Sequence, residues 1–172
     1  MKREGPIKGP DPAPEPIPRP QVTTDIGRGV VRLLSDLGIA ALPELPLANG
    51  RRVDIIGLGR DGAIHVVEIK SSRADFMTDR KWPEYLEFAE HFYFAVEAGF
   101  PMGLLPEAEG LIIADRFGAE LVRPARRRPL AGARRKALTL RFARVAAQRL
   151  VLPLLGPDIG VPPQDEPEAP SP

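Results

Sequence analysis

The sequence contains no cysteine, only two histidines, and an aromatic share of just 6%. Without cysteine there is neither a disulfide framework nor a thiolate metal site, and two histidines cannot build a standard zinc site without help from carboxylates. No apolar run approaches the roughly 20 residues of a membrane span, and no charged-then-apolar leader opens the chain. We therefore expect a soluble, cytoplasmic protein with no membrane partner.

Proline, by contrast, is abundant: the 172 residues include 21 prolines, concentrated toward the two ends. Proline-rich chain favours extended polyproline II over helix or sheet, so residues 1–22 and 156–172 are predicted to be disordered tails. A hydrophobic content of 43% suffices for one ordinary domain, which we place at residues 23–124. Residues 125–155 form a separate basic segment. The net charge of +1 argues neither for nor against nucleic acid.

The most informative stretch is residues 53–72, VDIIGLGRDGAIHVVEIKSS. It is typical of two short strands joined by a Gly/Asp turn. Side chains alternate along a strand, so Glu68 and Lys70 share one face while Ile69 points to the other, and the hairpin brings Asp54 near Glu68. Two carboxylates about 4 Å apart repel by about 4 kcal/mol at an effective dielectric near 20, which a shared proton, a protein cation or a metal ion must offset.

A hard divalent cation such as Mg²⁺, which prefers oxygen ligands, would complete the charge balance that Lys70 begins. Such an arrangement suits metal-assisted hydrolysis of a phosphodiester. Glu44 lies on the preceding predicted strand, residues 42–47, and is either a third site carboxylate or an ordinary charge on an edge strand. Arg52 could offset this acid or contact a phosphate.

Asp54, thirteen intervening residues, and then Glu68-Ile69-Lys70 resemble the PD-(D/E)xK signature of the restriction-endonuclease-like nucleases, with Val53 in place of the usual proline. A longer string is similar to the MmcB-type family of bacterial DNA-repair proteins over roughly residues 24–124. That string continues through residues 75–76 (DF), 79–85 (DRKWPEY), 92–96 (FYFAV), 104–106 (LLP) and 110–115 (GLIIAD).

The resemblance implies an α/β fold, with a restriction-endonuclease-like mixed β-sheet flanked by helices. It also implies a Mg²⁺-dependent DNA endonuclease of DNA repair, with Mn²⁺ as a possible substitute. Asp54, Glu68 and the carbonyl of Ile69 would hold the metal, and Lys70 would position the attacking water. DNA is the expected substrate, in the bacterial cytoplasm at the nucleoid; DNA-repair protein partners and a homodimer remain open.

The flanking segments predict helices that place further groups near this motif. Residues 24–37 have helical spacing of apolar residues, with Thr24 as the cap. A second helix is expected to start at Ser72, with Asp75 making the return bond, so that Ser72 and Arg73 lie beside the motif where helix N–H groups could meet a phosphate. A third helix is predicted over residues 83–90, and Lys81 is assigned to the DNA side.

Arg28 and Arg32 lie one helical turn apart, either on a solvated face or as phosphate contacts. His65 has the strand parity opposite to that of Glu68 and is not assigned to the site. Trp82, Tyr85 and Phe88 are interpreted as core residues rather than base-stacking ones.

Ten basic residues fall between positions 123 and 149, and no acidic residue falls between Glu120 and Asp158. Residues 134–152 also carry apolar residues at helical spacing, which predicts a basic amphipathic helix packed on the core. Phosphate, an anionic membrane, an acidic partner and a plain solvated surface are all compatible with this charge. Beside a candidate nuclease motif we favour DNA-backbone contacts by Arg134, Arg135 and Lys136, independent of base sequence.

Two functions therefore compete. The first is the metal-dependent DNA nuclease; the alternative is a non-catalytic DNA-binding accessory protein of DNA repair that uses the same fold. A ribonuclease is a third, less favoured reading. Metal dependence of cleavage, against salt-dependent binding without metal, separates the first two.

Overall fold

The computed structural model describes residues 19–155, and the two predicted tails lie largely outside that range. The elements follow the order α1 (Arg19–Asp36), β1 (Ala40–Pro46), β2 (Arg52–Leu58), β3 (Ile64–Lys70), α2 (Arg73–Thr78), the 3-10 helix η1 (Trp82–Phe88), β4 (His91–Val96), the 3-10 turn η2 (Met102–Leu104), β5 (Gly110–Ala114), β6 (Ala119–Arg123) and α3 (Gly132–Leu155).

The six strands form one mixed sheet in the order β1-β2-β3-β4-β5-β6. The pairs β3–β4 and β4–β5 are parallel, whereas the other three pairs are antiparallel. Each parallel step is bridged by a crossover, through α2 and η1 in the first case and through η2 in the second. The predicted mixed α/β sheet flanked by helices is confirmed, as is the position of β1 at an edge.

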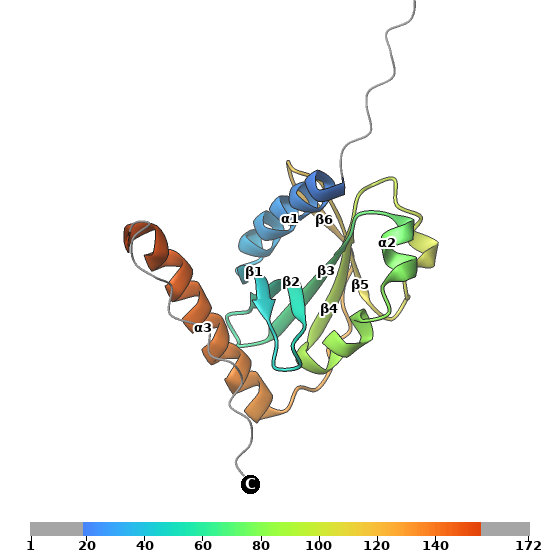
Figure 1. Ribbon diagram of the computed structural model, residues 1–172. Helices are drawn as coiled ribbons and strands as arrows, with labels where there is room; N and C mark the ends of the chain where they lie inside the picture. The colour runs from blue at the N-terminus through green and yellow to red at the C-terminus, as the bar shows by residue number, and fades with distance from the viewer. Residues whose placement is uncertain (1–18, 156–172) are drawn as a thin grey trace, which may run out of the picture.

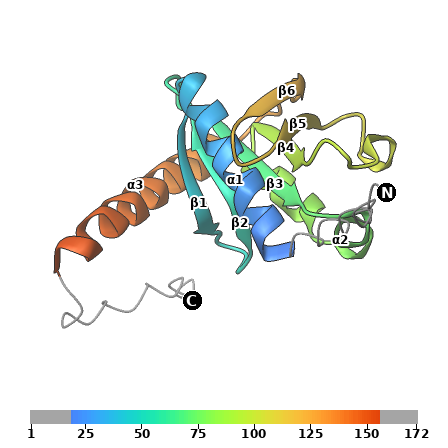
Figure 2. The same ribbon diagram turned by 90° about the horizontal axis from the view of Figure 1, so that it is seen from above.

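The sheet separates two apolar layers, each covered by helices (Figure 1). On one face α1 packs Ile26, Val30 and Leu34 against the central strands. On the other face lie η1, the Phe76 ring of α2, and the first half of α3, which buries Leu138 and Phe142. In both ribbon views the second half of α3 extends away from the sheet (Figures 1 and 2).

The helix α1 begins at Arg19, five residues before the predicted start at position 24. Proline costs nothing in the first turn of a helix, where its missing N–H would have no intrahelical partner, so Pro20 does not stop the helix. Thr24 is consequently not a cap; its hydroxyl donates to the carbonyl of Pro20 inside the helix, at 2.9 Å. The predicted cap at Thr24 is wrong for this reason.

The predicted helix over residues 83–90 is a 3-10 helix, η1, which ends at Phe88. Two of its aromatic side chains, Tyr85 and Phe88, are buried, and the Trp82 ring packs against Phe92 and Phe94. The interpretation of these rings as core residues is confirmed. A 3-10 helix stacks side chains three residues apart on one side, which matches this spacing.

Candidate functional site

The site is built where β2 and β3 separate. Their ladder runs as far as the pair Ile55–Val67, and beyond it the Asp54 carboxylate accepts the N–H of Ile69 at 2.7 Å. A side chain thus replaces the backbone carbonyl of the neighbouring strand. In an extended strand the N–H and C=O of one residue point toward the same neighbour, so the carbonyl of Ile69 faces the same gap.

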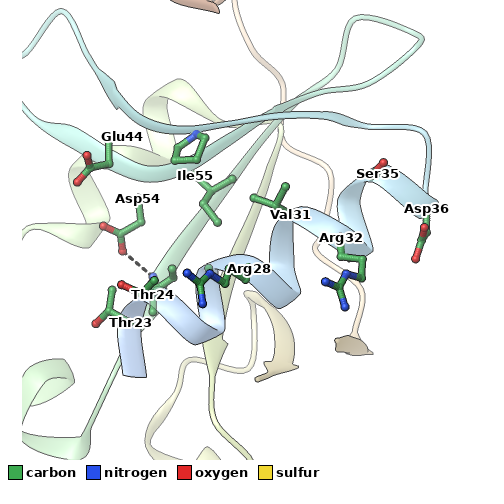
Figure 3. Close-up of a pocket in the computed structure, with 13 residues that line it drawn as sticks. Thr23, Thr24, Arg28, Val31, Arg32, Ser35, Asp36, Glu44, Asp54 and Ile55 are labelled. Atoms are coloured by element: carbon green, nitrogen blue, oxygen red, sulfur yellow. Dashed lines mark hydrogen bonds between the residues drawn. The ribbon is translucent and has the colours of Figure 1, made fainter. Parts of the chain in front are cut away.

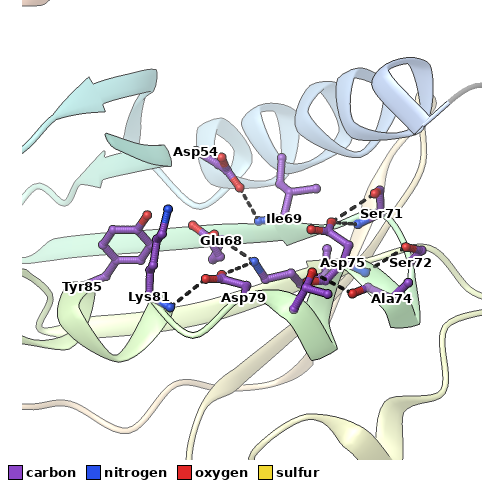
Figure 4. A network of polar contacts seen from close by, with 12 residues as sticks. Asp54, Glu68, Ile69, Ser71, Ser72, Ala74, Asp75, Asp79, Lys81 and Tyr85 are labelled. Atoms are coloured by element: carbon purple, nitrogen blue, oxygen red, sulfur yellow. Dashed lines mark hydrogen bonds and ion pairs between the residues drawn. The ribbon is translucent and has the colours of Figure 1, made fainter. Parts of the chain in front are cut away.

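Glu68 and Lys70 lie on the opposite face of β3 from Ile69, as the alternation predicts (Figure 4). Both are buried, with 6% and 3% of their surface exposed. The Lys70 ammonium donates to Glu68 Oε1 at 3.0 Å and also pairs with Asp79, which follows α2. The structure therefore brings the predicted Asp54, Glu68 and Lys70 together and adds Asp79.

Negative charge exceeds positive charge in this cluster. Burial, and then the charge of Asp54, raise the pKa of Glu68 to about 8. Burial also raises the pKa of Asp54, although the Ile69 N–H and the Lys70 ammonium act in the other direction. The second carboxylate oxygen of Glu68, Oε2, is buried and has no hydrogen-bond partner among residues 19–155. One ammonium does not satisfy both acids, and a further cation or a proton would.

Lys70 and Asp79 form the ionised part of the cluster. Burial lowers the pKa of Lys70, but Glu68 and Asp79 outweigh burial, and the pKa is raised overall. Burial raises the pKa of Asp79, yet the hydrogen bond from Lys70 and the backbone N–H of Lys81 leave it below the ordinary value. In the sequence Asp79 is part of the string, residues 79–85, that resembles the MmcB-type family, but nothing there distinguishes it from surface acids.

The N-terminus of α2 lies directly after this motif. Ser72 caps it as predicted, since its hydroxyl accepts the N–H of Asp75 at 3.1 Å. The Asp75 carboxylate in turn accepts from the N–H and the hydroxyl of Ser71, rather than from the N–H of Ser72 as predicted. Arg73 and Lys81 are both exposed near the cluster, and contact of either residue with DNA stays a prediction.

Glu44 lies on the edge strand β1, between the residues that pair with Ile55 and Val53 on β2. Its φ angle of 53° is in the left-handed region, which is unusual for a residue other than glycine. The carboxylate of Glu44 pairs with Arg52 at 3.2 Å, and both side chains are mostly exposed. Within residues 19–155 no group of three or more His, Cys, Asp or Glu side chains is placed to hold a metal ion, so Glu44 does not complete such a cluster.

Several arginines of the basic segment are engaged inside the fold. Arg135 holds the carboxylate of Glu90 at 2.7 and 3.0 Å, and Arg128 pairs with Glu109 at 2.6 Å. Both carboxylates are almost fully buried, at 1% and 3% exposure. Arg134 pairs with the exposed Glu87. The glutamates that pair with these arginines precede Glu120, outside the stretch without acidic residues. The charge pattern within that stretch therefore could not predict that they lie beside the arginines. Of the three predicted DNA contacts here, Arg134 and Lys136 are exposed, whereas Arg135 is partly buried.

A groove of about 670 Å³ runs between α1 and the strands β1 and β2 (Figure 3). Asp54 and Glu44 line one part of it, together with Ile69 from β3. Arg28 and Arg32 line the α1 wall. The sequence placed these arginines one turn apart, but only the packing of α1 over the sheet shows that they share a groove with Asp54.

Fold and site together define an α/β protein with an Asp–Glu–Lys cluster at the point where two central strands of a mixed sheet diverge. The family model described as "DNA repair protein MmcB-like" matches residues 12–154. The chain belongs to this MmcB-like family of DNA repair proteins, which confirms the resemblance to the MmcB-type family.

A solved structure of a protein of unknown function from Silicibacter pomeroyi is similar to this chain. The two are 44% identical with a TM-score of 0.78, and the match covers 82% of this chain and 97% of the other. None of the curated proteins matches the chain. None of the helices within residues 19–155 has the length and apolar character needed to cross a membrane.

Proposed function

We propose that the protein is a Mg²⁺-dependent nuclease that hydrolyses phosphodiester bonds of DNA during repair, with Mn²⁺ as a substitute metal. The observation that carries the proposal is the unpartnered, buried Oε2 of Glu68 beside Asp54. Lys70 satisfies only the other oxygen, Oε1, and burying a carboxylate oxygen without a partner is costly, so the cluster is suited to capture a positive ion. Cleavage would be structure-specific or independent of sequence.

The residues present fit a hard divalent cation. The Asp54 and Glu68 carboxylates and the carbonyl of Ile69 would be its ligands, all of them oxygens. When bound, the ion supplies Lewis-acid stabilisation to the charge that develops on the phosphate. Glu68 would have to lose the proton that its raised pKa retains, so metal binding strengthens as pH increases toward 8.

Lys70 supplies a fixed positive charge. Because its pKa is raised, it remains an ammonium at neutral pH and cannot act as a general base. Its bond to Asp79 orients the ammonium toward Glu68, where it can orient water and stabilise a phosphate oxygen. Asp79 is therefore a positioning residue, which acts through Lys70.

The test is to incubate the purified protein with single-stranded, flapped, gapped and branched DNA, with Mg²⁺, Mn²⁺ or chelator. Asp54→Asn and Lys70→Ala should abolish cleavage, whereas Asp61→Asn, which changes an exposed acid in the β2–β3 turn, should retain it. Cleavage that survives in both site variants, or that proceeds equally well with chelator, contradicts the proposal.

The second candidate is a DNA-binding accessory protein without chemistry. The depth of Lys70 favours it, since the ammonium is 3% exposed and already holds two carboxylates. This candidate predicts salt-dependent DNA binding that needs no metal and is unchanged in Asp54→Asn. Lys136→Ala is the suitable probe of the basic segment, because replacing Arg135 would also release the buried Glu90.

A further inference from the structure

The groove between α1 and the β1–β2 hairpin continues directly from the carboxylate of Asp54 (Figure 3). Its walls combine aliphatic side chains, among them Val31, Ile55 and Ile69, with the hydroxyls of Thr23 and Thr24. A volume of about 670 Å³ lies within the range of about 300–1,000 Å³ typical of pockets that enclose a small ligand. The groove is therefore a built recess rather than a flat surface.

Two arginines, Arg28 and Arg32, place positive charge on the α1 wall of this recess. The lining also holds the carboxylates of Asp36, Glu44 and Asp54, of which Glu44 is paired with Arg52. Residues four apart on a helix are neighbours, with about 5–6 Å between their Cβ atoms, so Arg28 and Arg32 form a short row along α1. The Arg28 side chain is 63% exposed, and its one ion pair with any of residues 19–155 is that with Asp25, at 3.6 Å. Arg32 donates to the carbonyl of Phe117, a bond that fixes its position and leaves further N–H groups of the guanidinium available.

We infer that this groove binds a single, unpaired strand of DNA, with Arg28 and Arg32 contacting consecutive phosphates and Asp54 at the end where the strand reaches the cluster. The inference rests on the proposed nuclease function and specifies its substrate class. A recess of about 670 Å³ has the size of a small-ligand pocket and is too small to enclose a duplex, whose major groove alone is about 12 Å wide. A single strand exposes its phosphates on a narrow, flexible chain that the recess can hold.

The lining also limits how the strand is recognised. No aromatic side chain from the described residues, 19–155, lines the groove, so we expect no base stacking on protein rings there. Sugars and bases would instead pack on the aliphatic wall. Binding should accordingly be independent of base sequence and dominated by the two phosphate contacts.

The test measures binding rather than cleavage. A fluorescein-labelled oligothymidine and a labelled hairpin duplex of equal charge are titrated with protein in chelator, by anisotropy, over a series of salt concentrations. We expect tighter binding of the single strand. Each phosphate contact with a single strand contributes about −0.7 to the slope of log K against log salt, so Arg28→Ala with Arg32→Ala should reduce the slope by about 1.4 and weaken binding about tenfold or more.

Two further variants make the result specific to the groove. Arg126→Ala removes an exposed arginine outside the groove lining and should bind like the original protein. Val31→Trp fills the recess without changing charge and should abolish single-strand preference while the melting temperature stays within a few degrees. Arg28→Lys with Arg32→Lys should restore most of the lost affinity.

Equal or tighter duplex binding, or a double alanine variant no weaker than Arg126→Ala, overturns the inference. So does unaltered single-strand binding by Val31→Trp. The nuclease proposal fails separately, by absent or metal-independent cleavage, because these titrations contain no metal. If the protein does not cleave DNA but binds a single strand through the groove, the nuclease proposal is wrong and the groove inference holds for a DNA-binding protein. If the groove variants cleave DNA as well as the original protein does, the groove inference is wrong and the nuclease proposal holds.

Discussion

Replacing Glu68 by glutamine should stabilise the metal-free protein, and the gain should grow with pH. In the fold the pKa of Glu68 is raised to about 8, whereas the unfolded chain has its ordinary value of 4.5. Between these two values the unfolded chain releases the proton and the folded chain keeps it, so rising pH destabilises the original protein. Glutamine has the shape of the protonated acid and carries no such penalty.

The size of the effect follows from this interval. Each pH unit between the two pKa values changes the unfolding free energy by about 1.4 kcal/mol. Over the whole interval the advantage of Glu68→Gln amounts to at most about 5 kcal/mol, absent near pH 4.5 and complete near pH 8. In Glu68→Gln the Lys70 ammonium can donate to the amide oxygen of the glutamine and still pairs with Asp79, so the substitution preserves the contacts of the ammonium.

The assay is urea unfolding in chelator at pH 5, 6, 7 and 8 for the original protein, Glu68→Gln and Glu107→Gln, whose side chain is exposed. The Glu107 variant should follow the original protein throughout. Saturating Mg²⁺ at pH 8 should then stabilise the original protein, by about 2.7 kcal/mol at a hundredfold excess over Kd, and Glu68→Gln much less. Parallel unfolding free energies for the original protein and Glu68→Gln across this pH range would refute the reasoning.

Three further predictions test packing and the ion pairs. A Cβ on Gly29 would lie 2.3 Å from backbone carbonyls of the β5–β6 turn, so Gly29→Ala should lower the free energy of unfolding in urea by about 1–3 kcal/mol. In the control Gly27→Ala the new Cβ meets only ordinary van der Waals contact, so the free energy of unfolding should stay the same or increase. Equal effects of the two substitutions would contradict the close approach at Gly29. Glu90→Gln should lower the unfolding free energy by about 1–3 kcal/mol, because the buried amide that replaces the carboxylate forms no ion pair with the arginines, which can turn to solvent. An unchanged unfolding free energy would contradict a structural role of this ion pair. Asp79→Asn should lower the pKa of Lys70, read by NMR titration of labelled lysine, and an unchanged pKa would show that Asp79 does not hold the ammonium.

Local pattern was sufficient for much of the sheet. The strand predicted over residues 42–47 and the two strands predicted within residues 53–72 are present as β1, β2 and β3, because each is a short apolar or alternating run bounded by a turn. Alternation with a period of two also placed Glu68 and Lys70 on one face and Ile69 on the other. The cap at Ser72 follows from an equally local rule, since its hydroxyl reaches an N–H three residues away.

Local pattern failed where two signals competed within one turn. The proline content predicts extended chain up to residue 22, yet Pro20 falls in the first turn of α1, the one turn of a helix that tolerates proline. The segment around η1 has the apolar spacing of a helix but closes as a 3-10 helix. In both cases the sequence predicted the presence of the element, and packing decided its bounds or its hydrogen-bond pattern.

What the sequence determined by itself is the content of the site: two acids and a lysine on neighbouring strands, with their faces set by alternation. Only the tertiary structure decided their partners, namely that Asp79 holds Lys70, that Asp54 takes the N–H of Ile69, and that Glu90 receives Arg135. The reason is physical: side-chain direction along one element is a local property, whereas which distant charge lies opposite depends on how the layers pack. The groove beside Asp54 exists for the same reason, since neither α1 nor the β1–β2 hairpin contains it alone.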